Sequence, residues 1–109
     1  MGEKEYLKQI DTDGAVRVRY RIVTERGQVV YVVVQLEARE QEQWHVVVRY
    51  DNAHGLLHRD EMDASGRETK SAIQMPTLEM FVSYAELDIA DRWQWYCDRF
   101  LARLRRRSR

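Results

Sequence analysis

The chain lacks the features that mark several protein classes. One cysteine in 109 residues excludes an internal disulfide, and we expect a reducing compartment, most simply the cytoplasm. The longest uncharged apolar run, residues 29–36, is too short to span a membrane. The charged first residues are not followed by the apolar segment of a secretory signal. With no repeat or linker, we expect one soluble domain over residues 1–109 and no membrane association.

Charge is balanced overall but unevenly spread. The net charge is zero. Residues 99–109 contain six arginines and no acid, which leaves 12 basic against 18 acidic residues in 1–98, a net charge of −6. The sequence thus combines an acidic body with a basic tail at residues 102–109. Arginines suit the C-terminus of a helix, where we expect this tail to fray, and they also suit contact with nucleic acid or an acidic partner.

Apolar residues recur with a period of two in the first and third of three consecutive segments, and the second segment is apolar on both faces. In residues 16–22 they alternate with three arginines, which predicts a strand with one apolar and one basic face. A turn signal at 25–28 precedes a second strand at 29–38, which is rich in β-branched residues. A polar stretch at 39–43 leads to a third strand at 44–50. Short connections between consecutive strands predict an antiparallel meander.

The period changes to that of a helix after Pro76. Thr77 is a plausible N-cap, and apolar residues then recur at helical spacing as far as Leu104, with a bend or break expected near residues 88–91. Residues 4–10 suit an edge strand, and residues 58–73 suit a further hairpin around a turn at 63–66. The sequence predicts an α+β fold, in which an antiparallel meander sheet of four to six strands is covered on one face by a long C-terminal helix.

The sheet face turned away from this helix is expected to mix cations with aromatic and apolar side chains. Its expected members are Arg17, Arg19, Arg21, Tyr31, Val33, His45, Val47 and Arg49. Three interpretations are open. The arginines lie along a solvated face; exposed valines beside a tyrosine form a homodimer interface; or the face binds RNA or DNA, since cations contact phosphates and tyrosines stack on bases.

The densest group of reactive side chains is residues 50–60, YDNAHGLLHRD, directly after an apolar strand. It holds two of the three histidines. His54 and His58 could serve as acid and base, Arg59 could hold a phosphate, and Tyr50 or Asp51 could orient a histidine. This is the set of groups that a metal-independent ribonuclease needs.

Two other interpretations of this segment stay open. His54 and His58 with Asp51 or Asp60 resemble a metal ligand set, but Gly55 argues against the helix that would bring both histidines to one side, so we expect no metal and no cofactor. Alternatively, the segment is structural. Asp51 then forms a turn, Gly55 supplies a positive φ, and His58 bonds a backbone carbonyl.

Several motifs together resemble a small prokaryotic family of unknown function. They are VVQLE at 33–37, Trp44 followed by VRYDxAHGxxHRD at 48–60, DxxG at 63–66, and Trp93, Tyr96 and RFL at 99–101. The resemblance covers about residues 16–101. More distantly, the strand ending in Arg-Tyr-Asp-Asn, the histidine loop and the late helix are similar to TumE-like toxins of toxin–antitoxin pairs.

The similarity to TumE-like toxins implies a target and a partner. RNA would be the target, and an antitoxin-like protein would be the partner. The positions that would carry toxicity are Arg49, Tyr50, Asp51, His54, His58 and Arg59. The toxins carry a denser His-Arg-His run before the helix, where this chain has His58-Arg59-Asp60 and then an added hairpin.

Overall fold

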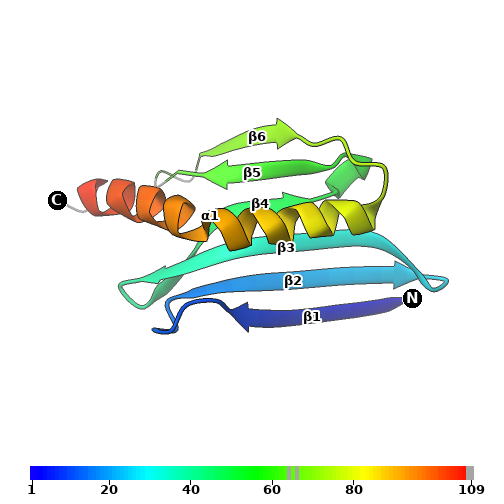
Figure 1. The fold of residues 1–109 in the computed structure, drawn as a ribbon, viewed down its shortest axis with the longest axis horizontal. Helices are drawn as coiled ribbons and strands as arrows, with labels where there is room; N and C mark the ends of the chain where they lie inside the picture. The colour runs from blue at the N-terminus through cyan, green and yellow to red at the C-terminus, as the bar shows by residue number, and fades with distance from the viewer. Residues whose placement is uncertain (64, 66, 108–109) are drawn as a thin grey trace.

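The computed structural model describes residues 1–63, 65 and 67–107. Six strands form one antiparallel sheet in sequence order, and one long helix, α1 (Leu78–Arg107), packs on one of its faces (Figure 1). The predicted α+β meander covered by a C-terminal helix is confirmed. In the part of the chain described, no helix has the length and apolarity needed to cross a membrane.

The strands follow the predicted segments closely. They are β1 (Gly2–Gln9), β2 (Val16–Glu25), β3 (Gln28–Glu40), β4 (Gln43–Asp51), β5 (His58–Met62) and β6 (Glu68–Ala72), with a short 3-10 helix, η1 (Ala53–Gly55), between β4 and β5. The β2–β3 hairpin turns through Arg26 and Gly27, whose φ angles of 52° and 76° suit the two-residue turns that match strand twist. The predicted turn at 63–66 includes positions 64 and 66, which lie outside the described residues.

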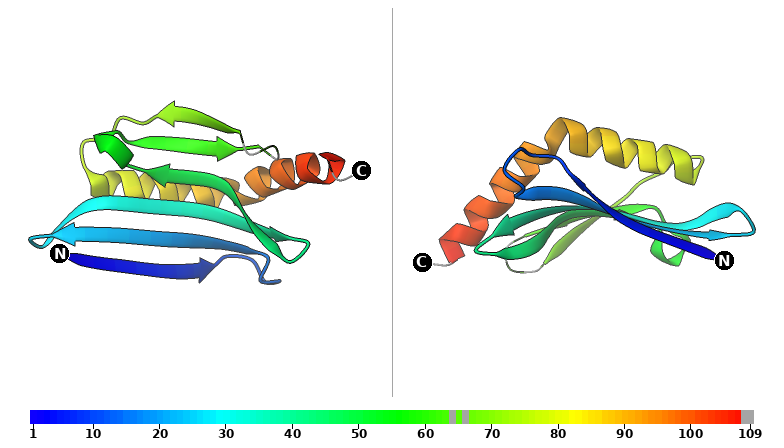
Figure 2. Two further views of the ribbon diagram at one scale, coloured as in Figure 1. Left: turned by 180° about the vertical axis from the view of Figure 1, so that it is seen from behind. Right: turned by 90° about the horizontal axis from the view of Figure 1, so that it is seen from below.

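Helix α1 begins where the sequence predicts. The Thr77 hydroxyl accepts the backbone N–H of Met80 at 3.1 Å, which satisfies one of the free amides of the first turn. The helix is continuous, but its axis bends part-way along (Figure 2). It runs on to Arg107, and Arg105 contacts Glu40 at 2.7 Å. Fraying of the basic tail stays a prediction, and positions 108 and 109 lie outside the described residues.

The hydrophobic core lies between α1 and the sheet. Leu36 and Tyr50 from the sheet and Phe81 from the helix are fully buried there. The other buried members are Val16, Val18, Tyr20, Val32, Val34, Ala38, Val47 and Val48 from the strands and Ala85, Ile89, Tyr96, Cys97 and Phe100 from the helix. We call the opposite face, with Arg17, Arg19 and Arg21 on β2 and the residues level with them on the other strands, the open face.

A β-bulge interrupts the alternation of β4. Leu36 pairs with Val48, but the next residue along, Glu37, pairs with Val46. Val47 is therefore an extra residue without a partner on β3. An extra residue shifts the strand by one position, which exchanges the two faces for everything beyond it.

The bulge corrects two predicted placements. His45 lies on the helix side with its ring 5.7 Å from that of Phe100, and Val47 belongs to the buried core. Trp44 lies on the open face instead, where the guanidinium of Arg17 stacks over its ring at 3.7 Å. The prediction that His45 and Val47 share the open face was wrong, because simple alternation assumes an unbroken strand.

Candidate functional site

The histidine-rich segment forms the end of one hairpin, and its pairing decides where each side chain points. The paired residues of β4 and β5 are Arg49 with Asp60, Tyr50 with Arg59, and Asp51 with His58. Paired residues share a face and neighbours along a strand alternate. The central pair therefore faces α1, and the two outer pairs lie on the open face. The six residues singled out by the resemblance do not form one site.

On the helix side, Tyr50 and Arg59 belong to a network centred on Asp88 of α1. Its Oδ2 atom accepts the hydroxyl of Tyr50 at 2.5 Å and that of Tyr96 at 2.7 Å, and it lies 3.5 Å from the Arg59 guanidinium. Burial, aided by these hydrogen bonds to Asp88, raises the pKa of Tyr96 to about 12 and that of Tyr50 further. Arg59 also donates to the hydroxyl of Tyr84 at 3.3 Å. These contacts tie the helix to the sheet.

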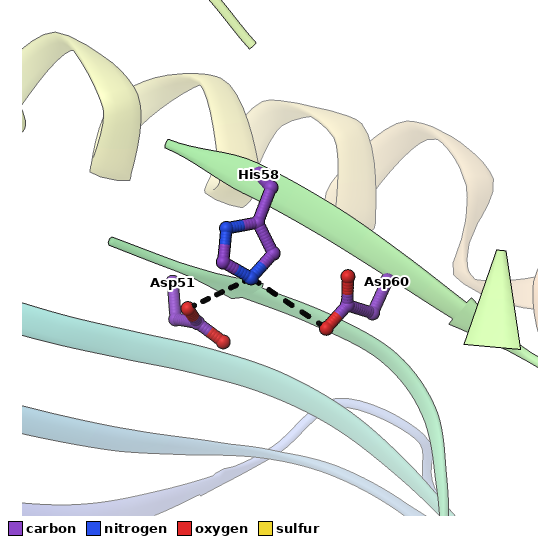
Figure 3. A group of neighbouring side chains, drawn as sticks. All are labelled: Asp51, His58 and Asp60. Atoms are coloured by element: carbon purple, nitrogen blue, oxygen red, sulfur yellow. Dashed lines mark ion pairs between the residues drawn. The ribbon is translucent and has the colours of Figure 1, made fainter. Parts of the chain in front are cut away.

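On the open face, Asp51, His58 and Asp60 converge (Figure 3). We call them the Asp51–His58–Asp60 cluster. The Nε2 atom of His58 lies 3.1 Å from Oδ1 of Asp51 and 3.7 Å from Oδ2 of Asp60. The Nδ1 atom of the same ring lies 3.0 Å from the carbonyl oxygen of Leu56, which can only accept a hydrogen bond. Both ring nitrogens of His58 are therefore engaged.

Two cations flank the cluster. Arg49 contacts Asp51 at 2.8 Å, and Lys70 of β6 contacts Asp60 at 3.3 Å. Although burial alone would lower it, the hydrogen bond and charge of Asp51 hold the pKa of Arg49 above its ordinary value. Both aspartates are at least 95% buried, so their charges depend on these neighbours for stabilisation.

A groove with a volume of about 940 Å³ runs beside the cluster, lined by residues 53–58, Lys70 and residues 72–76. Its polar side chains are those of His54, His58, Lys70 and Gln74, and most of the remaining surface is apolar. The structure thus brings both predicted catalytic histidines to one groove, although only His58 joins the carboxylates. Lys70 comes from β6, the second strand of the predicted hairpin, and lies opposite Asp60 in the register of β5 and β6.

His54 occupies a special backbone position in η1. Its φ of 60° lies in the left-handed region, and the next residue, Gly55, has a φ of 77°. Asp51 also accepts the backbone N–H of Ala53 at 2.9 Å. These features confirm the structural predictions of a turn at Asp51, a positive φ at Gly55 and a carbonyl bond from His58. The exposed side chain of His54 makes no hydrogen bond or ion pair with any described residue.

The arginines of the open face are paired with carboxylates. Arg17 and Arg19 contact the two oxygens of the buried Glu37 at 2.7 and 3.2 Å, and Arg21 contacts Glu3 at 2.6 Å. Burial raises the pKa of Glu37, but hydrogen bonds from Arg17, Gln35 and Arg19 outweigh it and hold that pKa below its ordinary value of 4.5. This face is a lattice of alternating charges and not a basic surface.

The aromatic and apolar groups predicted on the open face are covered as well. Tyr31 lies beneath Arg21, 5.7 Å from ring centre to guanidinium, and its hydroxyl accepts from Arg49 at 3.4 Å. A homodimer patch would need exposed valines, yet Val33 is 5% exposed and Val47 1%. The homodimer therefore remains a prediction, and the valines on which it was based are buried.

Comparison with known proteins places the chain in a family. The model of a domain of unknown function, DUF7718, matches residues 1–106. The chain belongs to this family. The prediction of a family of unknown function is thereby confirmed in its general form, and the match gives no link to toxins. No curated protein and no solved structure matches this DUF7718 chain.

Sequence reasoning about this DUF7718 chain missed the roles of Asp88 and Lys70 and gave Asp60 only a minor one. A signal for Asp60 existed, because residues two apart on a strand share a face and His58 and Asp60 are both in β5. Lys70 and Asp88 come from other elements, and only the pairing of β5 with β6 and the packing of α1 bring them in.

Proposed function

We propose that the protein cleaves RNA in the groove beside η1, with His54 as the acid–base group and Lys70 as the phosphate-binding cation. The observation that supports this most is that one groove collects His54, His58 and Lys70 from separate elements. An imidazole titrates near neutral pH and an ammonium binds phosphate, so the two together suit attack on a phosphodiester.

The chemistry needs one proton acceptor and one cation. Neutral His54 removes the proton of a ribose 2′-hydroxyl, and the resulting oxygen attacks the adjacent phosphorus. The bond from phosphorus to the 5′ oxygen breaks, that oxygen takes a proton from water, and the hydroxide left behind takes the proton that His54 carries. Hydrogen bonds to Glu68 and Asp60 raise the pKa of Lys70, so its ammonium stays charged and stabilises the negative charge that builds up on the phosphate.

The other predicted catalytic residues receive supporting roles in this proposal. His58 has both ring nitrogens engaged, so it shapes the groove wall and does not transfer protons. Tyr50 and Arg59 hold α1 against the sheet through Asp88. Arg49 pairs with Asp51, and Asp51 holds the loop by accepting the backbone N–H of Ala53. The choice of RNA, and of an antitoxin-like protein as partner, rests on the resemblance to TumE-like toxins.

Induced expression in bacteria tests this proposal. We expect the wild type to arrest growth and to fragment cellular RNA, and we expect His54→Asn and Lys70→Gln to do neither. Asn suits this test because it tolerates a positive φ better than Ala does. Lys8→Gln is the matched control, since Lys8 is also an exposed strand lysine but lies on β1, away from the groove. Equal arrest by wild type and His54→Asn would contradict the proposal.

A second candidate is a non-catalytic role, in which the open face binds nucleic acid or a protein partner. The stacking of Arg17 on Trp44 favours it, because such a pair presents a flat surface on which a base or a side chain can stack. Binding to nucleic acid by this face should weaken steeply with salt, and Arg19→Glu should flatten that dependence. Salt-insensitive binding, or binding that Arg19→Glu leaves unchanged, would exclude nucleic acid on this face.

A further inference from the structure

We propose that the Asp51–His58–Asp60 cluster binds one divalent transition-metal cation. This goes beyond the proposed cleavage of RNA, which assigns no metal, and it reverses the expectation from sequence that no metal binds. The cluster draws its three ligands from the facing ends of β4 and β5, so strand pairing replaces the helical spacing on which a metal site seemed to depend.

The donor atoms are spaced as a metal would require. His58 Nε2 lies 3.1 Å from Asp51 Oδ1 and 3.7 Å from Asp60 Oδ2, and one donor atom from each residue lies within 4.8 Å of the others. Metal–ligand bonds of about 2.1 Å at a tetrahedral angle separate neighbouring donors by about 3.4 Å. A cation can therefore be held by small side-chain movements, without any change in the strands.

The orientation of His58 is that of a metal ligand. A backbone carbonyl cannot donate, so the 3.0 Å contact with Leu56 places the ring proton on Nδ1. Nε2 is then the nitrogen that faces the two carboxylates, and a cation between them would replace any proton that it shares with them. Metal-binding histidines usually donate their other ring N–H to a carbonyl or carboxylate in the same way.

Asp60 supplies an independent indication of a missing partner. Its Oδ1 atom is buried and has no hydrogen-bond partner among the described residues, although the side chain as a whole is 5% exposed. Figure 3 shows its carboxylate turned toward His58. A buried carboxylate oxygen without a partner is costly, and a cation bound by both oxygens of Asp60 would remove that cost. His58 also lines the groove, which gives the cation a route in from solvent.

Lys70 is a cation that would compete with a metal ion for Asp60. It lies 3.3 Å from Asp60, but its side chain is 59% exposed and it also contacts Glu68 at 3.1 Å. It can therefore release Asp60 and keep Glu68. Arg49 contacts Asp51 through Oδ2, whereas Oδ1 accepts the backbone N–H of Ala53 at 2.9 Å and keeps a second lone pair for the cation.

The ligand set indicates which cations fit. Two carboxylates and one imidazole suit first-row divalent ions such as Zn²⁺ and Mn²⁺. Ca²⁺ prefers six to eight oxygen ligands, and Mg²⁺ keeps most of its water, so both should bind more weakly at a site with an imidazole.

Calorimetric titration of the EDTA-treated full chain with Zn²⁺ and Mn²⁺ tests the site. We expect one cation per chain with a Kd below about 10 µM, and a loss of affinity of more than about tenfold in His58→Asn and in Asp60→Asn. His54→Asn is the matched control, because it removes a histidine of the same groove that lies outside the cluster. Lys70→Gln should tighten binding about two- to fivefold by removing the competing charge.

Nitrogen NMR of the histidine rings gives a second readout that needs no variant. Zn²⁺ should shift Nε2 of His58, leave its Nδ1 proton in place and leave His45 and His54 unchanged. No binding, or binding that survives His58→Asn or shifts other rings, would overturn the proposal. The two proposals are separable, since Lys70→Gln should strengthen metal binding while it weakens RNA cleavage.

Discussion

Replacing Asp88 by Asn should strongly destabilise the protein. One carboxylate oxygen of Asp88 accepts the hydroxyls of Tyr50 and Tyr96 at 2.5 and 2.7 Å and lies 3.5 Å from the Arg59 guanidinium. Tyr50 is fully buried. The amide of Asn has the same shape but no charge, so both hydrogen bonds weaken and Arg59 loses its counter-ion.

The magnitude follows from these contacts. A hydrogen bond to a charged acceptor contributes about 1.5–3 kcal/mol, and removing one partner of a buried ion pair costs about 3–5 kcal/mol. The two effects overlap, because the Asn oxygen still accepts one hydroxyl, so we expect a loss of about 3 kcal/mol. In a domain of this size that corresponds to a fall in Tm of about 12 °C.

Urea unfolding followed by circular dichroism and tryptophan fluorescence measures this loss. Asp91→Asn is the matched control, since Asp91 lies one turn further along α1, its side chain is 83% exposed, and its one ion pair among the described residues is with Arg92, at 3.9 Å. The control should change the free energy of unfolding by less than about 0.5 kcal/mol. If Asp88→Asn also costs less than about 1 kcal/mol, the network does not hold helix and sheet together.

Three further predictions concern pH and backbone strain. The pKa of Glu37 is lowered from 4.5, so its contribution to stability is present above that pH and is lost as the pH falls further; Glu37→Gln should flatten the acid limb of a stability–pH curve. The pKa of Tyr96 is raised from 10.0 to about 12, so the free energy of unfolding should fall as the pH rises through that window, and Tyr96→Phe should remove part of the fall. His54→Gly should raise the free energy of unfolding by about 1 kcal/mol, because glycine adopts the φ of 60° without strain, and a Tm that falls instead would contradict this.

The sequence was sufficient to predict the fold because its local patterns agree with one another. Alternation in residues 16–22 predicted β2, and the change of period after Pro76 predicted α1 with its cap at Thr77. Such agreement between local pattern and global fold is what allows a topology to be predicted from sequence.

The bulge at Val47 could not be predicted in the same way. It arises because β4 has one residue more than its partner β3 between two paired positions, and no residue of β4 marks that place. A shift of one residue placed Trp44 and His45 on the faces opposite to those expected.

The candidate site was predictable only in part. The sequence identified the loop but treated neighbours such as Tyr50 and Asp51 as one group, although alternation in a strand sends them to opposite faces. Lys70 lies in the predicted hairpin, but its contact with Asp60 depends on the exact register of β5 and β6. Asp88 lies far from the loop in sequence, and its contacts depend on the docking of α1.

The most direct test of the central claim, that the groove beside η1 cleaves RNA, is incubation of purified protein with a defined RNA. Wild type and His54→Asn are compared, and the products are resolved by length and by their 3′ ends. We predict that the wild type produces fragments with 2′,3′-cyclic phosphates and that His54→Asn, with an unchanged Tm, produces none. Cleavage by both proteins, or by neither, would contradict the account.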